Sequence, residues 1–254
     1  MMSVPRETEV KTTKSKGYYV SGNWEGRAET PDELAARFLR MIDSFEEIDP
    51  VFSLWTSGRK RPRKFETIRD RYAEEIAAGV TTDDWGESVP SDGYWFSART
   101  RDTPNNRSFA VRCKAGSVLK YSFTNHVTLT TSSLADPRPD ADVVSYRVFR
   151  AALLAIVDAW EPVRAGAYSQ QLIQLYASDS FFPAAWIQYL CPWLAEKITP
   201  PSTVLSECLP NGGLLMSATT ETFDVDNLAH LKAAQDMAAA MAPLDLLPWP
   251  SQRA

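Results

Sequence analysis

The residues of this chain best suited to acid–base chemistry are its two histidines. His126 lies in "FTNHVTL", where strand alternation groups it with Thr124 and Thr128, and this stretch contains no carboxylate to act with it. We therefore interpret His126 as a strand-surface or partly buried histidine rather than a general base. His230 falls in the first turn of an expected helix, where a positive charge is unfavourable, and we interpret it as an exposed neutral ring.

Adjacent acids could also supply general acid–base groups. The pairs Asp83–Asp84 and Glu46–Glu47 are of this kind, but neighbouring acids on a loop or a helix surface are usually solvated. The sequence contains none of the GxSxG, HExxH and GxxxxGK(S/T) motifs of hydrolases with a nucleophile elbow, zincins and P-loop proteins. An enzyme with an unrecognised carboxylate site is therefore the alternative to a non-catalytic function.

Metal-ligating patterns are weak in this chain. The stretch "DVDN" at 224–227 is similar to the start of a calcium-binding loop, but the sixth position, which needs Gly, is Ala229, and the twelfth is Gln235 rather than Glu. Helix capping explains these residues better. An odd number of widely spaced cysteines indicates reduced core thiols rather than a disulfide framework or a metal site: Cys113, Cys191 and Cys208. We expect no metal and no cofactor.

A basic stretch, "SGRKRPRKF" at 57–65, raises the question of nucleic-acid binding. Acids lie on both sides of it, at 46–49 and 66–75, and no aromatic residue stands between its charges to stack on a base. The whole chain is also acidic, with 27 Lys and Arg against 32 Asp and Glu, whereas nucleic-acid binders usually present a basic field. We therefore interpret it as a solvated turn and expect no nucleic-acid partner. Binding through Arg59, Lys60 and Arg61 is the third alternative.

The most unusual feature is a group of aromatic residues beside acids in "DDWGESVPSDGYWF" at 83–96. Trp and Tyr often anchor protein interfaces, and neighbouring acids attract a basic partner. The alternative is that the tryptophans are core residues and the acids line a turn, since large aromatic side chains are usually buried. Our candidates for contact with a protein partner are Trp24, Glu25, Asp83, Asp84, Trp85, Glu87, Tyr94 and Trp95.

The elements that must position these residues are short strands and a few helices. The clearest helix begins at Thr30, which forms a capping box with Glu33 and precedes a regular apolar stripe. Further helices are predicted over 65–79, 141–160 and 226–241, the last capped by Asp226 with Leu228, Leu231, Met237 and Met241 as its buried edge. Strands are predicted at 17–26, 51–55, 183–190, 202–210 and 211–219, with an antiparallel meander over 93–131.

Consecutive strands with few helices favour an α+β fold, a mostly antiparallel sheet flanked by about four helices in a single domain. We expect that domain over 17–242, between a flexible tail at 1–16 and a Pro-rich tail at 243–254. The chain is 44% hydrophobic, so it can form a core. It has no apolar segment of a signal peptide and no apolar run of membrane-spanning length. We therefore expect a cytoplasmic protein without a membrane partner.

Three blocks of the sequence together resemble one protein family. They are "YYVSGNWEGRAETPDELAARFLRMIDSFEEIDPVFSLW", followed by "GRKRPRK"; "PAAWIQYLCPWL"; and "NGGLLMSATTETFDVDNLAHLKAA". Their order and spacing resemble the immunity protein 52 family over most of residues 17–242. On this view the basic turn belongs to the fold pattern of the family.

The resemblance implies an antidote encoded beside a toxin of a bacterial polymorphic or type VI secretion system. Such toxins are often nucleases of a restriction-endonuclease-like fold, which makes a cognate nuclease the expected partner. The protein would bind it stoichiometrically in the cytoplasm, with no turnover and no cofactor. The acidic composition is compatible with this, since a negative surface can imitate the phosphates that a nuclease binds.

Overall fold

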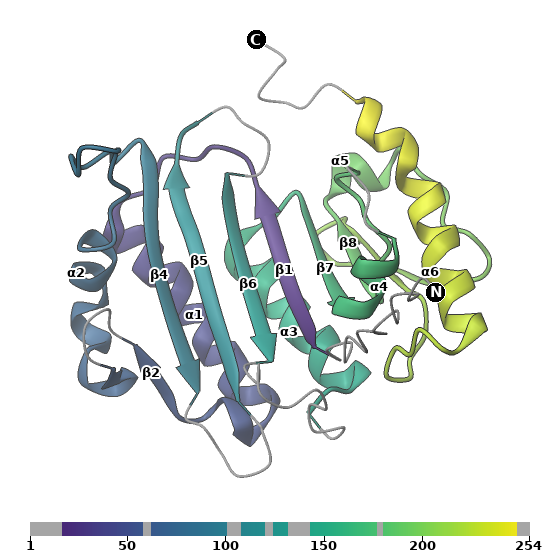
Figure 1. Cartoon of the computed structure of the whole chain (residues 1–254), viewed down its shortest axis with the longest axis horizontal. Coiled ribbons are helices and arrows are strands. Elements are labelled where there is room, and N and C mark those ends of the chain that lie inside the picture. The colour runs from purple at the N-terminus through teal and green to yellow at the C-terminus, as the bar shows by residue number, and fades with distance from the viewer. Residues whose placement is uncertain are drawn as a thin grey trace, which may run out of the picture.

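The computed structural model describes residues 17–57, 62–100, 108–119, 124–131, 143–176 and 180–247. They contain one ten-stranded sheet in the order β3-β2-β4-β5-β6-β1-β7-β8-β10-β9, and every neighbouring pair is antiparallel (Figure 1). The strands are β1 Tyr18–Trp24, β2 Trp55–Ser57, β3 Arg63–Lys64, β4 Asp92–Thr100, β5 Phe109–Ser117, β6 Asn125–Thr131, β7 Arg164–Ser169, β8 Ile187–Leu190, β9 Leu205–Cys208 and β10 Leu214–Ser217. The predicted antiparallel α+β domain is confirmed.

The helices differ greatly in length. They are α1 Pro31–Ile48, α2 Tyr72–Ala77, α3 Tyr146–Trp160, α4 Gln170–Leu175, α5 Pro192–Ala195 and α6 Leu228–Met241, with 3₁₀ turns at Pro50–Phe52, Phe65–Thr67, Arg69–Arg71 and Ala242–Leu246. Within the described ranges there are thus six helices where about four were predicted, because α4 and α5 are too short to give a periodic pattern. None of the described helices is long and apolar enough to cross a membrane.

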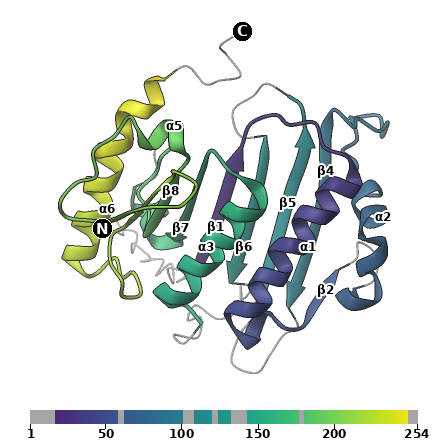
Figure 2. The same ribbon diagram turned by 180° about the vertical axis from the view of Figure 1, so that it is seen from behind.

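Helices α1 and α3 cover one face of the central strands (Figure 2). The capping box of α1 is present: the Thr30 hydroxyl accepts from the Glu33 amide, and the Glu33 carboxylate accepts from the Thr30 amide at 2.8 Å. The predicted apolar stripe of α1 is buried in full. On the sheet, Trp24 of β1 stacks on Trp160 of α3 with ring centroids 5.0 Å apart. The core therefore lies between these two helices and the sheet.

Two predicted elements are placed or shaped differently in the structure. The predicted strand at 51–55 is a 3₁₀ turn followed by β2, so the strand begins only at Trp55. The predicted helix at 65–79 starts as two 3₁₀ turns and becomes helical only in α2. Its large apolar residues are nevertheless buried, and Phe65 and Tyr72 both pack against Phe38 of α1. Packing against α1 therefore buries one side of this segment, although most of its first half is 3₁₀ rather than α-helical.

Strand β7 was not predicted, although it lies in the middle of the sheet. Its sequence "RAGAYS" has no alternation, because it is enclosed on both sides and almost every position is buried. It pairs with β1 and with β8 and so joins the two halves of the sheet. By contrast, the strands predicted at 202–210 and 211–219 are both present: β9 and β10 pair across a turn at Asn211 and Gly212, with Gly212 at φ 80°.

The prediction for the last helix was right in extent and for most of its buried edge, since Met237 and Met241 are buried and Leu231 packs against the core. Helix α6 is capped by Asn227 rather than Asp226, and Leu228 is exposed. His230, predicted to be exposed, is buried against Phe223 with ring centroids 5.8 Å apart. Its Nδ1 accepts from the Asp224 amide at 3.2 Å. A hydrogen bond from the preceding loop therefore holds this ring at the buried side of the helix.

Several predictions concern segments outside the described residues. These are the tail at 1–16, the centre of the basic turn at 58–61 and the last residues at 248–254. Part of the predicted C-terminal tail is described, and Leu244 in it is buried. Of the three cysteines, Cys113 and Cys191 are buried thiols as predicted, whereas Cys208 is exposed.

Candidate functional site

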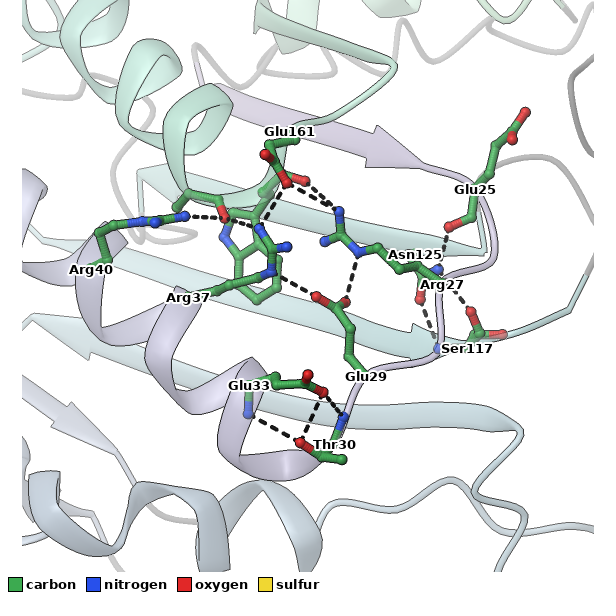
Figure 3. A network of polar contacts seen from close by, with 12 residues as sticks. Glu25, Arg27, Glu29, Thr30, Glu33, Arg37, Arg40, Ser117, Asn125 and Glu161 are labelled. Atoms are coloured by element: carbon green, nitrogen blue, oxygen red, sulfur yellow. Dashed lines mark hydrogen bonds and ion pairs between the residues drawn. The ribbon is translucent and has the colours of Figure 1, made fainter.

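A network of charged groups joins the loop after β1 to helices α1 and α3 (Figure 3). Glu29, whose side chain is only 5% exposed, forms ion pairs with Arg27 at 3.1 Å and Arg37 at 2.7 Å. Glu161 lies within 3.6 Å of Arg27 and 3.1 Å of Arg37. Figure 3 also shows the Glu25 side chain directed away from these groups. Opposite charges here face each other in pairs, which is the arrangement of a structural network.

Arg27 and Arg37 of this network, together with Arg40, also donate hydrogen bonds to the last carbonyls of helix α3. Arg37 donates to the Ala159 carbonyl at 2.9 Å, Arg40 donates to it at 3.0 Å, and Arg27 donates to the Trp160 carbonyl at 3.3 Å. The last carbonyls of a helix lack intrahelical partners and carry partial negative charge, so cations stabilise them. The network therefore fixes α1 against the end of α3 and supports the sheet from its helical side.

A tight turn at Asp83–Glu87 presents one exposed tryptophan. The Asp83 carboxylate accepts from the amides of Trp85 at 3.0 Å and Glu87 at 2.8 Å, and the Asp83 amide donates to the Glu87 carbonyl at 2.9 Å. Gly86 supplies the positive φ of 85°. Trp85 is 87% exposed. The turn thus holds a large aromatic side chain in solvent, beside the exposed Asp84.

The second exposed tryptophan, Trp95, lies on the sheet face opposite α1 and α3. Because burial alternates along the strands, this face takes three positions from each of four neighbouring strands. We call it the open sheet face; Figure 1 shows no helix in front of β4, β5 and β6. The open sheet face consists of Trp95, Ser97 and Arg99 of β4, Ala110, Arg112 and Lys114 of β5, His126, Thr128 and Thr130 of β6, and Tyr19, Ser21 and Asn23 of β1.

One row of the open sheet face is an interacting unit. Trp95, Lys114 and His126 stand opposite one another on β4, β5 and β6. The Lys114 ammonium lies 5.6 Å from the Trp95 ring centroid and 2.8 Å from an Asp92 carboxylate oxygen. Burial lowers the pKa of His126 below its ordinary value, and the charge of Lys114 adds to this effect. His126 is therefore a neutral, half-buried ring near pH 7, in agreement with the prediction.

The structure separates the predicted contact residues into distinct places. Trp24 is 2% exposed inside the core, so its side chain offers no surface to a partner. Tyr94 is partly buried and packs against the core, while its neighbour Trp95 points to the open sheet face and is 41% exposed. The segment that leads into the turn of Trp85 is joined to β4, because the Trp95 amide donates to the Gly79 carbonyl and the Thr81 amide donates to the Gly93 carbonyl.

Acids suited to catalysis are not gathered in the described parts of the chain. The pKa of Glu46 is raised, first by partial burial and then by the nearby charge of Asp43. Glu46 nevertheless stands on the exposed side of α1. No group of three or more His, Cys, Asp or Glu in the described ranges is placed to hold a metal ion. The DVDN stretch serves as a cap: the Asp224 carboxylate accepts from the Asp226 amide, and Asn227 caps α6.

Sequence reasoning missed the cations of the open sheet face, which are Arg99, Arg112 and Lys114. The signal was present, because these residues alternate with buried apolar positions along β4 and β5. The sequence does not show that these three cations come together on one sheet face whose positions include no acid. That depends on the register of the strands.

The comparisons with known proteins bear on the whole chain. The model of one family, Immunity protein 52, matches residues 16–248. No curated protein matches the chain. Among solved structures, the "Pseudomonas aeruginosa T6SS protein PA0821" matches with 10% identity and a TM-score of 0.48, covering 87% of this chain and 74% of that chain. Since the family model covers nearly every residue described above, including the Asp83–Glu87 turn and the whole sheet, the chain belongs to the immunity protein 52 family.

Proposed function

We propose that this protein neutralises a cognate secreted bacterial toxin by binding it stoichiometrically. The observation that carries the proposal is the family match over residues 16–248. In this function the protein works as a rigid surface: it forms a tight complex in the cytoplasm, needs no cofactor and turns nothing over. A polymorphic or type VI secretion system is the proposed source of the toxin, and a nuclease is the proposed class.

The Asp83–Glu87 turn is the first proposed contact with the toxin. Trp85 has the chemistry of an interface anchor, since a large amphipathic ring contributes more binding energy than most residue types. The three hydrogen bonds through Asp83 support this, because a turn held in place before binding loses little conformational entropy when it binds. The exposed Asp84 and Glu87 would attract cations at the rim of the toxin.

Co-expression with the toxin domain encoded next to this protein tests the proposal. Bacteria that express the toxin domain alone should die, and those that also express this protein should survive and yield a complex on size exclusion. Trp85→Ala should weaken protection, whereas Leu228→Ala, which shortens an exposed apolar side chain on α6, should protect like the wild type. Death of cells that contain both soluble proteins would reject that toxin as the target.

A further inference from the structure

The open sheet face has a charge opposite to that of the whole protein. The chain carries a formal net charge of −5. Among the positions that form the open sheet face, Arg99, Arg112 and Lys114 are cationic and none is Asp or Glu. Two acids lie beside it: Asp92, which pairs with Lys114, and Glu75, which pairs with Arg63 and lines the same hollow as Arg112. A positive face on an acidic protein is a specific feature rather than a consequence of composition.

The arginines of the open sheet face also differ from those on the helical side. Arg37, Arg69 and Arg150 each form an ion pair with an acid. Arg99 and Arg112 are exposed, and neither pairs with an acid in the described part of the chain. A charge without an internal partner can bind a carboxylate of another molecule without first breaking an ion pair.

The surface around Arg112 is shaped as well as charged. Two hollows, of about 190 Å³ and about 160 Å³, lie beside each other and share Ser57, Ser97 and Arg112 in their walls. Trp95 lines the first hollow and Arg99 the second. A guanidinium group between two depressions, with an aromatic ring at one of them, offers both bidentate hydrogen bonding and apolar contact to entering side chains.

The strands hold these groups in fixed positions. β5 pairs with β4 on one side and β6 on the other along most of its length, so Arg112 and Lys114 project from the middle of the sheet. The contacts of Lys114 with Trp95 and Asp92 fix that row further. Groups on a rigid sheet are better ordered before binding than groups on a loop.

We propose that the open sheet face binds a cluster of Asp and Glu side chains on the toxin, through Arg99 and Arg112 with Trp95 as the apolar anchor. The proposal rests on the proposed function and adds the chemistry of the partner surface. The acidic Asp83–Glu87 turn, joined to the same strand β4, has the opposite sign. Two neighbouring contacts of opposite sign fix the orientation of a partner, since a reversed partner would meet like charges.

The test is the affinity of purified protein for the neighbouring toxin domain at several salt concentrations. We compare the wild type with the double variant Arg99→Glu and Arg112→Glu. The matched control is Arg71→Glu with Lys197→Glu, which reverses two exposed cations elsewhere and changes the net charge equally. The proposal predicts at least about a tenfold loss of affinity for the first variant and about a twofold change or less for the control. Equal affinities for the two variants would overturn it and leave the proposed function intact.

A second arm separates failure of this inference from failure of the proposed function. A decaglutamate peptide is titrated into isotopically labelled protein, and the Trp95 indole signal, assigned with Trp95→Phe, is followed by NMR. The proposal predicts that this signal shifts in the wild type, and that the shift is lost with Arg99→Glu and Arg112→Glu. If the toxin domain does not bind at all, a shift of the Trp95 signal still supports an acidic partner for the open sheet face. Absence of that shift overturns the inference. Tighter binding of single-stranded DNA than of the peptide at the same face would also overturn it.

Discussion

The ring of Trp95 on β4 meets the ring of His126 on β6 edge to face, with centroids 5.5 Å apart and an angle of 74° between the planes. The two strands are not neighbours, because β5 lies between them and contributes Lys114 to the same row. The contact thus spans three strands. It joins a half-buried histidine to the most exposed aromatic ring of the open sheet face, so protonation of His126 should change the environment of the Trp95 ring.

The first prediction concerns pH. Because the pKa of His126 in the folded protein is lowered from 6.5, mainly by burial, the unfolded chain binds the proton more readily. His126 therefore contributes stability that is present above about pH 6.5 and is lost as the pH falls through its folded pKa. Urea unfolding of wild type and His126→Gln from pH 7.5 to 5 should show a steeper loss for the wild type. Parallel curves would contradict the assignment.

The second prediction concerns the network of Figure 3. Glu29→Gln removes the buried charge that faces both Arg27 and Arg37 and leaves these two guanidinium groups with the exposed Glu161 as their shared acid. We expect a loss of about 2–3 kcal/mol in the free energy of unfolding, somewhat less than for a fully buried pair. Urea titration measures it. Asp158→Asn is the control, since Asp158 is 73% exposed and should contribute under about 1 kcal/mol.

The third prediction separates binding from stability at Trp85. This side chain packs on little of the protein, so Trp85→Ala should leave the midpoint of thermal unfolding within about 2 °C of wild type. The affinity for the toxin should nevertheless fall by about tenfold or more, as expected for an aromatic anchor. Calorimetric unfolding and binding titrations on the same samples decide this. An unchanged affinity would remove the turn from the interface.

The fourth prediction separates the shape of the turn from its charge. Asp83→Asn keeps a side-chain oxygen able to accept from the amides of Trp85 and Glu87, whereas Asp83→Ala does not. If Asp83 acts by ordering the turn, the Asn variant should bind like the wild type and the Ala variant should bind several-fold more weakly. If both variants weaken binding equally, the charge of Asp83 matters and its geometry does not.

The sequence predicted the fold correctly where strong local signals are enough to determine the structure. Helix α1 is an example, because its capping box and apolar stripe agree with each other and with the core that it covers. Helix α6 shows the limit: its extent and most of its buried edge were predicted, but Leu228 is exposed and His230 is buried, where it accepts a hydrogen bond from the preceding loop. Strand β7 was missed because a strand enclosed on both sides shows no alternation.

The candidate site was only partly visible in the sequence for a related reason. The proximity of aromatic residues and acids pointed to the segment that carries Trp85 and Trp95, and both are exposed. The same rule also selected Trp24, which is buried against Trp160. Arg112 and His126 could not be joined to this segment, because they come from other strands and meet Trp95 only through the register of the sheet.

Residual toxin activity at increasing molar ratios of this protein tests the central claim most directly. Stoichiometric neutralisation predicts a linear fall in activity that reaches zero at one protein per toxin and does not change with incubation time. Loss of toxin activity at a small fraction of that ratio, growing with time, would show that this protein modifies the toxin catalytically. If the toxin keeps its full activity when this protein is present in molar excess, neutralisation of that toxin is contradicted altogether.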